Sequence, residues 1–321
     1  MLILETSLDG NYGIGVYTKT LKNNIEYDLS ISLISKDKTV YNYIKKCIWI
    51  YCNSNKDDIF YSSSFVAPIL FKGKVILTIH DLIHLEYYKE TKFWFYYSFL
   101  KYIVRPDIIV TGSSYSSTSI RKFFGKKVKI VNCGYCLNEN LKNRPKKSFH
   151  LDYDYFFVPT NRKDHKNDIL LIKAFSKSKS KNKLNLVFLG KPTQEVYQLI
   201  KKLNLLKKVY FLGNITDEEL YFYYKYSKAV IFISKIEGFG FPVIESIYFK
   251  KPIILSDIPV FKEFKFESIK FINHLELSEI VKVLDNFNNI KFLSKDLSQL
   301  KKYEKVLFLS NINKMLNSTK K

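Results

Sequence analysis

The chain of 321 residues is 46% apolar and 26% charged, and its 26 Phe and 24 Tyr residues exclude an intrinsically disordered chain. Four cysteines are too few for a disulfide-rich secreted scaffold, and 11 Gly and 8 Pro exclude a fibrous or linker-like sequence. A net charge of +22 predicts a phosphate-rich partner (nucleic acid, anionic lipid or a phosphorylated small molecule), although the composition bias of an AT-rich genome would also produce it.

Neither the start of the chain nor its apolar segments predict export or a membrane span. The first residues, MLILETSLDGNYG, have no basic start and no long apolar core, so we expect no signal peptide. The best candidate for a span, Phe93 to Val110, is interrupted by Lys101, Arg105 and Asp107, short of the ~20 apolar residues that a span needs.

Short apolar runs alternate with amphipathic segments along most of the chain. Most runs are continuous, which is typical of strands buried on both faces of a parallel sheet. The predicted strands are Ile31–Ile34, Val75–Ile79, Ile108–Thr111, Val128–Val131, Tyr155–Val158, Leu184–Leu189, Val209–Leu212, Ala229–Ser234 and Pro252–Leu255. The helices predicted between them include Ile169–Ser176, Val196–Lys202 and Glu218–Tyr226. This alternation predicts βαβ units and a doubly wound α/β architecture.

The strands fall into two series, which predicts two domains. The polar, basic segment Asn138–Phe149 contains Pro145 and separates the series. We therefore predict an N-terminal domain at 1–143, a linker at 144–148, a second domain at 149–292, and a helical segment at 293–321 that packs back on the first domain. Two doubly wound domains facing each other imply a cleft, with ligands at the carboxyl ends of the strands.

The segment from Ile231 to Pro259 carries the most chemistry. A predicted strand ends at Ser234, a glycine-containing loop follows, and a helix is predicted to begin near Gly240. Gly238 and Gly240 allow close approach of the backbone to a ligand, and a helix N-terminus offers N–H groups to an anion. Glu237 and Glu245 are expected to face one pocket, where carboxylates accept hydrogen bonds from sugar or ribose hydroxyls.

These residues resemble a known family. Glu237-Gly-Phe-Gly-Phe-Pro-Val-Ile-Glu245 resembles the E-x7-E signature of retaining, nucleotide-sugar-dependent glycosyltransferases of family 4, which have the GT-B fold. The following segment, Lys250 to Pro259, is similar to the family's G-x-P-V-x-x-S-D-x-P pattern, with Lys250 in place of glycine. Further segments that match in the family's order are Gly13-Ile-Gly15-Val-Tyr17, Thr78-Ile-His80-Asp81-Leu82, Asn161-Arg-Lys-Asp-His-Lys166-Asn167, and Phe211-Leu-Gly213 with Thr216-Asp-Glu-Glu-Leu220.

The resemblance implies a GT-B fold, with two doubly wound Rossmann-like domains facing a cleft, the acceptor in residues 1–143 and the nucleotide sugar in 149–292. It implies a retaining hexosyltransferase that moves a sugar, with mannose from GDP-mannose as the preferred guess, to a lipid-linked or growing surface glycan such as O-antigen or capsule. A non-catalytic GT-B scaffold that binds a glycan or an anionic lipid is the alternative. Nucleic-acid binding ranks last, because the basic residues form no recognised nucleic-acid motif.

The resemblance also assigns roles to single residues. The residues that it places at the catalytic centre are Glu237, for the hydroxyls of the transferred sugar, and His80; those that it places around the donor are Gly15, Arg162, Lys166, Gly238, Phe239, Gly240, Glu245 and Asp217. For two of these residues a purely structural role is an alternative to the functional one. A lone histidine such as His80 is often structural, and Asp217 lies in a Thr216-x-x-Glu219 capping box that explains it as the start of a helix.

The resemblance implies no cofactor and no metal ion, because basic side chains and helix ends neutralise the donor diphosphate. Cys133-x-x-Cys136 lacks the further ligands of a zinc site, and Asp152-Tyr-Asp154 is interpreted as a chance match to the D-x-D motif of metal-dependent transferases. The segment Lys92–Tyr102 presents aromatic residues flanked by cations, either as part of the core or as a contact with an anionic membrane. The predicted location is the cytoplasm, with the inner face of the cytoplasmic membrane left open.

Overall fold

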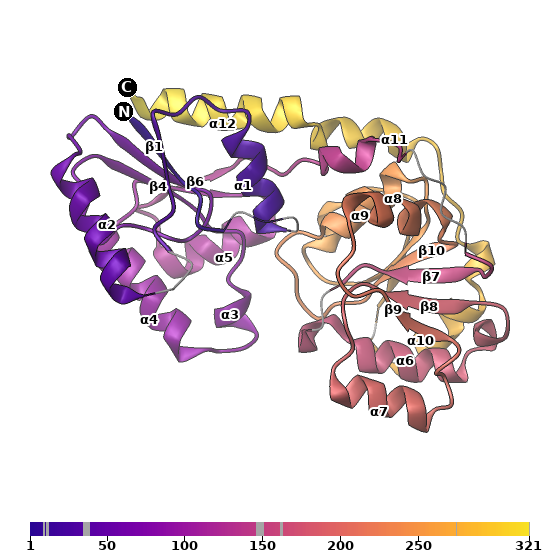
Figure 1. Cartoon of the computed structure of the whole chain (residues 1–321). Helices are drawn as coiled ribbons and strands as arrows, with labels where there is room; N and C mark the ends of the chain where they lie inside the picture. Colours follow the sequence, from indigo (N-terminus) through magenta and orange to yellow (C-terminus); the bar gives the residue numbers. More distant parts are fainter. Residues whose placement is uncertain are drawn as a thin grey trace. The chain divides into compact units, whose positions relative to one another are not determined.

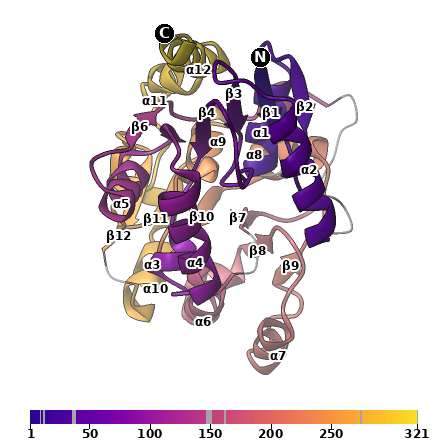
Figure 2. The ribbon, with the colours of Figure 1, turned by 90° about the vertical axis from the view of Figure 1, so that its left-hand side faces the viewer.

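The computed structural model describes residues 1–8, 10, 13–34, 39–145, 151–160, 163–273 and 275–320, and it divides the chain into two compact units. Unit 1 comprises Met1–Cys136 and Tyr303–Lys321, and unit 2 comprises Leu137–Lys302. Each unit has a sheet with helices packed on it (Figures 1 and 2). Within the described part of the chain, no helix is both long and apolar enough to cross a lipid bilayer.

Unit 1 is built on a parallel six-stranded sheet with the order β2-β1-β3-β4-β5-β6. Its strands are β1 (Leu2–Glu5), β2 (Leu29–Ile31), β3 (Ile59–Ser62), β4 (Lys74–Thr78), β5 (Ile108–Thr111) and β6 (Lys129–Asn132). Its helices are α1 (Ile14–Lys22), α2 (Val40–Cys52), α3 (Ile83–Glu86), α4 (Thr91–Phe99), its continuation η1 (Leu100–Val104), α5 (Ser114–Phe124) and α12 (Lys305–Lys320). Every residue of β1, β3 and β5 is buried, as expected of strands covered on both faces.

Unit 2 repeats this plan with the strand order β12-β11-β10-β7-β8-β9, again all parallel. Its strands are β7 (Tyr155–Val158), β8 (Asn185–Phe188), β9 (Val209–Phe211), β10 (Ala229–Phe232), β11 (Ile253–Ser256) and β12 (Ile269–Ile272). Its longer helices are α6 (Asp168–Lys177), α7 (Gln194–Lys202), α8 (Asp217–Tyr226), α9 (Phe241–Tyr248) and α10 (Leu277–Asp285). Shorter turns are η2 (Glu139–Lys142), η3 (Asp164–Lys166), η4 (Lys179–Asn182), η5 (Phe261–Glu263), η6 (Phe287–Asn289), α11 (Asp296–Gln299) and η7 (Leu300–Tyr303).

The doubly wound architecture is confirmed, and most predicted strands lie within two residues of the observed ones. The prediction at Ile31–Ile34 is displaced, because pairing with β1 places β2 at Leu29–Ile31. Leu33 then donates its N–H to the carboxylate of Glu5 instead of to a strand. Three strands were not predicted: β1, β3 and β12. In the edge strand β12 only Ile272 is buried and Lys270 is exposed, so it has no continuous apolar run.

The structure divides the chain earlier than predicted, between Cys136 and Leu137. The segment that follows belongs to unit 2 because η2 packs on α8, where Asn138 and Asn140 donate side-chain hydrogen bonds to Asp217 at 3.4 and 2.6 Å. Residues 146–148 of the predicted linker lie outside the described residues.

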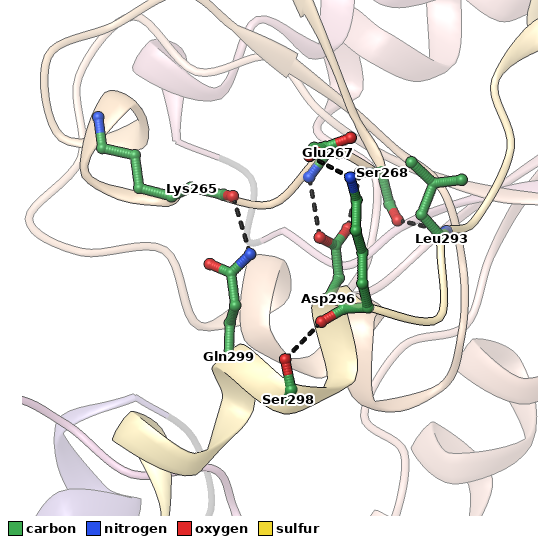
Figure 3. A network of polar contacts seen from close by, with 8 residues as sticks. Lys265, Glu267, Ser268, Leu293, Asp296, Ser298 and Gln299 are labelled. Carbon is green, nitrogen blue, oxygen red and sulfur yellow. Dashed lines mark hydrogen bonds and ion pairs between the residues drawn. The ribbon is translucent and has the colours of Figure 1, made fainter.

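The C-terminal segment 293–321, predicted to pack on the first domain, is shared between the units. Its first part stays with unit 2 because the buried carboxylate of Asp296 accepts hydrogen bonds from the backbone N–H groups of Glu267 (3.0 Å) and Ser268 (2.7 Å) (Figure 3). Only α12 lies along unit 1 (Figure 1), where Asn311 donates to the carbonyl of Cys133 at 3.2 Å.

Replacing Asp296 by alanine is expected to destabilise unit 2. Asp296→Ala leaves the N–H groups of Glu267 and Ser268 without their acceptor, which should lower the free energy of unfolding by about 1–3 kcal/mol. Denaturant unfolding measures this change. The control is Ser298→Ala, two residues away on the exposed side, which loses one local hydrogen bond. Equal stability of the two variants would contradict this role of Asp296.

Candidate functional site

Unit 2 has its topological switch point between the central strands β7 and β10. From β7 the chain continues to β8 and β9 on one side, and from β10 it continues to β11 and β12 on the other. Doubly wound sheets bind ligands outside the carboxyl ends of their strands at this point. The predicted donor segments follow these two strands, with Lys166 after β7 and Glu237 after β10.

Two hydrogen bonds join the loops that follow β7 and β10. The side-chain amide of Asn167 donates to the carbonyl of Ile233 at 2.9 Å, and the N–H of Lys235 donates to the carbonyl of His165 at 2.7 Å. Asn167 has a φ of 59°, a left-handed conformation that asparagine tolerates better than most residues, and it begins α6. These two hydrogen bonds therefore fix the loops relative to each other, and neither of them uses the side chain of Lys166 or Glu237.

Lys166 and Glu237 form an ion pair at this point, in which Lys166 Nζ donates to Glu237 Oε1. The two side chains are only 11% and 9% exposed, and the ammonium lies 5.0 Å from the centroid of the Phe232 ring. A ligand that carries phosphate would compete for Lys166, and one that carries hydroxyls would compete for Glu237. The structure thus brings these two predicted residues into direct contact.

Arg162, the second basic residue expected beside the donor, lies outside the described residues, as does Asn161. Its predicted role stays a prediction.

The loop Glu237–Gly240 is fixed by packing. Gly240 has a φ of 112°, and a Cβ placed there would lie 2.7 Å from the Phe261 ring, so this position requires glycine. Phe239 is nearly buried, with its ring 5.3 Å from those of Phe241 and Phe264. Helix α9 begins directly after the loop, so Gly238 and Gly240 precede a helix N-terminus, as predicted. Contact between the Phe239 ring and a donor stays a prediction.

Glu245 lies in α9, partly exposed, and accepts a hydrogen bond of 2.5 Å from the hydroxyl of the buried Tyr224. Desolvation raises the pKa of Glu245 to about 7; the Tyr224 hydrogen bond opposes this increase, and the nearby charge of Asp217 adds to it. Glu245 is therefore a carboxyl group that changes protonation state near neutral pH, beside a hydroxyl that fixes its orientation.

Asp217 occupies the first turn of α8, as the capping-box interpretation predicts. Thr216 and Glu219 exchange the reciprocal hydrogen bonds of that motif. The Asp217 carboxylate is engaged by Asn138 and Asn140, which tie the segment after β6 to α8. The carboxylate oxygens can accept further hydrogen bonds beside these two, and a contact of Asp217 with the donor stays a prediction.

His80, in unit 1, follows β4 and uses both ring nitrogens within the protein. Nε2 lies 3.1 Å from the carbonyl of Ser63, which can only accept, so Nε2 carries the proton and Nδ1 accepts from the Tyr135 hydroxyl at 2.7 Å. Desolvation lowers the pKa of His80 to about 4. This arrangement favours the structural alternative for the imidazole. A catalytic contact would use the His80 backbone or displace Tyr135.

Gly15 lies in the first turn of α1, in the glycine loop of unit 1. A Cβ there would come within 2.5 Å of the backbone of Gly10, so Gly15 lets the loop after β1 cross this helix. Two residues later, the Tyr17 ring meets the edge of His80 at 4.9 Å and of Phe308 at 5.4 Å. The glycine loop therefore supports the His80 cluster; a contact of Gly15 with a donor stays a prediction.

The motifs interpreted as false leads have structural roles. Cys133 and Cys136 are buried thiols, and burial raises the pKa of Cys133 to about 12. Asp154 forms an ion pair of 3.1 Å with Lys228 at the start of β7. Among the described residues, no cluster of His, Cys, Asp and Glu has the geometry of a metal site.

Sequence reasoning missed the two tyrosines that bond to Glu245 and His80. Tyr224 is one of several aromatic residues in α8, and nothing in the sequence distinguishes it from its neighbours. Tyr135 lies inside Cys133-x-x-Cys136, where the cysteines drew attention instead. The Tyr135 ring packs where a Cβ at Gly112 would stand, so a glycine directly after β5 was the available signal.

A family model described as "Glycosyl transferases group 1" matches residues 139–265, which hold the loop after β7 and the Glu237–Glu245 segment. Among curated relatives, the serotype-specific mannosyltransferase WbdA of Escherichia coli is 41% identical over 107 residues, or 32% of this chain and 13% of WbdA. The O-antigen chain mannosyltransferase RfbU of Salmonella typhimurium is 27% identical over 61% of this chain and 56% of its own length. The chain therefore matches only part of these relatives.

Solved structures share the fold over nearly the whole chain. HepE of Anabaena, in complex with UDP and glucose, superposes with a TM-score of 0.73 at 13% identity and covers 99% of both chains. Sucrose-phosphate synthase from Thermosynechococcus elongatus has a TM-score of 0.75 at 13% identity and covers 99% of this chain and 98% of its own. At this identity the likeness establishes the fold, and the predicted GT-B class of two Rossmann-like domains is confirmed.

We expect the imidazole of His80 to stay neutral down to about pH 4, because burial disfavours its charged form. In the unfolded chain it binds a proton near pH 6.5, so folding stability should fall as the pH is lowered from about 6.5 towards 4. An NMR titration of the ring protons, assigned with His80→Gln, measures the pKa directly. A midpoint near 6.5 for His80 would contradict the assignment.

Proposed function

We propose, from the premise that residues 139–265 belong to the glycosyl transferases group 1 family, that the chain is a retaining hexosyltransferase. It transfers a hexose from a nucleotide-diphosphate sugar to a growing surface glycan. The observation that carries this proposal is the contact of Lys166 with Glu237 at the switch point of unit 2. This pair offers a cation for a diphosphate and, directly beside it, an acceptor for sugar hydroxyls.

In the proposed reaction, Lys166 exchanges Glu237 for the donor diphosphate. The ammonium and the N-terminus of α9 then oppose the negative charge that grows on the departing nucleotide. Glu237, released from Lys166, accepts hydrogen bonds from the hydroxyls of the transferred sugar. The exchange leaves neither of these nearly buried side chains without a polar partner, which is consistent with their pairing before the donor arrives.

Glu245 is proposed to hold the ribose of the nucleotide. Its second oxygen is oriented by Tyr224, and in the ionised form both oxygens accept hydrogen bonds from the ribose hydroxyls. Because the pKa of Glu245 is raised to about 7, the accepting form predominates only above neutral pH. Nucleotide affinity should therefore increase with pH through this range.

The donor sugar is proposed to be mannose, carried by GDP. Support comes from the names of WbdA and RfbU, both mannosyltransferases, and RfbU acts on the O-antigen chain by its name. The acceptor is proposed to be a lipid-linked glycan of the O-antigen or capsule type, bound by unit 1 at the inner face of the cytoplasmic membrane. Charge neutralisation by Lys166 and helix ends needs no metal ion and no cofactor, so none is proposed.

Thermal unfolding in the presence of GDP, UDP, dTDP and their sugar conjugates, without added metal, tests the donor proposal. A ligand at ~100 times its dissociation constant should add about 2.7 kcal/mol to the stability. Stabilisation by GDP and GDP-mannose alone would support the proposed donor. Stabilisation by another nucleotide would replace GDP-mannose, and no shift with any of them would favour a non-catalytic scaffold.

Substitutions of the two glutamates should separate transfer from binding. Glu237→Gln removes the charge that pairs with Lys166, so affinity for the free nucleotide should be kept or strengthened, while transfer falls by about 10²–10³-fold. Glu245→Ala should weaken nucleotide binding by about 10–100-fold, because hydrogen bonds to a charged group are lost. It should also abolish the pH dependence of nucleotide affinity near pH 7. Calorimetric titration and a transfer assay measure these effects.

Glu195→Gln and Glu218→Ala, at exposed positions of α7 and α8, are the matched controls and should change neither property. Transfer at the parental rate by Glu237→Gln would show that the site is assigned wrongly. Melting temperatures of all variants report whether each one remains folded.

A further inference from the structure

Helix α2 of unit 1 exposes a continuous apolar stripe. Tyr41, Ile44, Ile48 and Tyr51 recur at a spacing of three or four residues, which places them on one side of the helix. Their exposed fractions are 73%, 41%, 59% and 43%, and Val40 and Trp49 are also exposed. The residues of α2 that pack on the sheet are different ones, chiefly Cys47 and Ile50. The helix is therefore apolar on the side that the core does not use.

The segment formed by α4 and η1 also has apolar side chains both in the core and on the surface. Tyr97 and Leu100 are buried in the core of unit 1, which satisfies the core interpretation of part of this aromatic segment. Trp94 and Phe95, however, are 54% and 68% exposed. In η1, Tyr102 and Ile103 are exposed to a similar extent. Both interpretations of the aromatic segment thus apply, to different side chains.

The two helices flank one loop and so form a single surface. The Tyr43 hydroxyl of α2 donates to the carbonyl of Ala67 at 2.6 Å, and the Tyr96 hydroxyl of α4 donates to that of Phe65 at 2.8 Å. Leu70, a few residues further along this loop, is 59% exposed. Figure 2 shows α2 and α4 on the side of unit 1 that faces the viewer. We call the exposed residues of α2, α4, η1 and this loop the aromatic face.

The charge of the aromatic face has one sign. Neither α2 nor the segment α4–η1 contains an Asp or a Glu, whereas both contain lysines. Lys45 is exposed next to the apolar stripe, and Lys72 lies 4.9 Å above the ring of Tyr51. Lys101 lies over the ring of Tyr102 at 5.2 Å. Aromatic and aliphatic side chains interleaved with lysines, without carboxylates, match the headgroup layer of an anionic bilayer.

We infer that unit 1 docks through the aromatic face onto a bilayer that contains anionic phospholipid. The exposed Trp, Phe, Ile and Tyr side chains enter the headgroup region, and the lysines contact lipid phosphates. Charge complementarity to anionic headgroups, together with the exposed Trp, Tyr and Phe side chains between the lysines, favours this occupant over a protein partner. The inference deepens the proposed function, on which it rests for its purpose, since docking would bring unit 1 to a lipid-linked acceptor.

The experiment is flotation of the full chain with vesicles of phosphatidylcholine alone or mixed with phosphatidylglycerol. The parent should float with the mixed vesicles only, and less at high salt, because salt screens the lysines. Ile48→Ser with Phe95→Ser should weaken this binding by about tenfold or more, since two exposed apolar groups no longer leave water. Lys45→Glu should weaken it by at least about fivefold, as each basic charge near the surface contributes.

Matched controls lie in unit 2, at positions that are also exposed. Tyr197→Ser with Leu206→Ser removes two apolar groups that are 49% and 50% exposed, and Lys202→Glu reverses an exposed lysine. These variants should float like the parent. Thermal unfolding with nucleotides checks that all variants fold, and it reports on the proposed function separately. Vesicle binding without any nucleotide binding would support docking through the aromatic face and contradict the proposed transferase function.

Three results would overturn the inference. The first is that the parent floats with neither kind of vesicle, and the second is that the aromatic-face variants float as well as the parent. The third is that the control variants lose as much vesicle binding as the aromatic-face variants. Light scattering adds a fourth. If the parent is a dimer and Ile48→Ser with Phe95→Ser makes it monomeric without changing flotation, the aromatic face is covered by a second copy of this chain.

Discussion

The contact between Lys166 and Glu237 determines the arrangement of the candidate site. It joins the loops that follow β7 and β10, strands that are neighbours in the sheet although seventy residues separate them along the chain. A charge pair with so little exposure is favourable only when its geometry is held, because both ions have left bulk water. The supporting bonds from Asn167 to Ile233 and from Lys235 to His165 hold that geometry, and Gly240, with a φ of 112°, directly precedes α9.

The described ionisable side chains of the candidate site in unit 2 have partners within that unit. Lys166 pairs with Glu237, Tyr224 donates to Glu245, and Asp217 accepts from two asparagines. The proposed donor would therefore bind by exchange, and it would gain affinity only where its own groups replace these partners with equal or better geometry. This requirement favours a ligand that carries both a diphosphate and hydroxyls, because it compensates Lys166 and the glutamates together.

Unit 1 combines a closely packed aromatic core with a surface on α2 that exposes apolar side chains. Tyr17 is packed between His80 and Phe308, so the last helix of the chain stabilises the cluster after β4. On α2 the side chains that face away from the core are apolar as well, with Ile48 and Tyr41 largely exposed. Burial of core residues is explained by folding alone, whereas the exposure of large apolar side chains beside lysines supports the proposed docking of unit 1 onto a bilayer.

The sequence by itself determined the alternation of strands and helices, the two series of strands, and the Glu237–Glu245 segment, because continuous apolar runs and fixed spacings are local properties of the chain. It also indicated the capping box at Thr216. Only the tertiary structure decided the partners of these side chains: Tyr224 for Glu245 and Tyr135 for His80. It also decided that Asp296 binds the turn before β12, which keeps residues 293–302 in unit 2. Local periodicity carries no information on which distant side chain fills a given space. The same limit applies to α2 and α4, since an amphipathic pattern shows which residues are apolar but not which side of the helix the sheet covers.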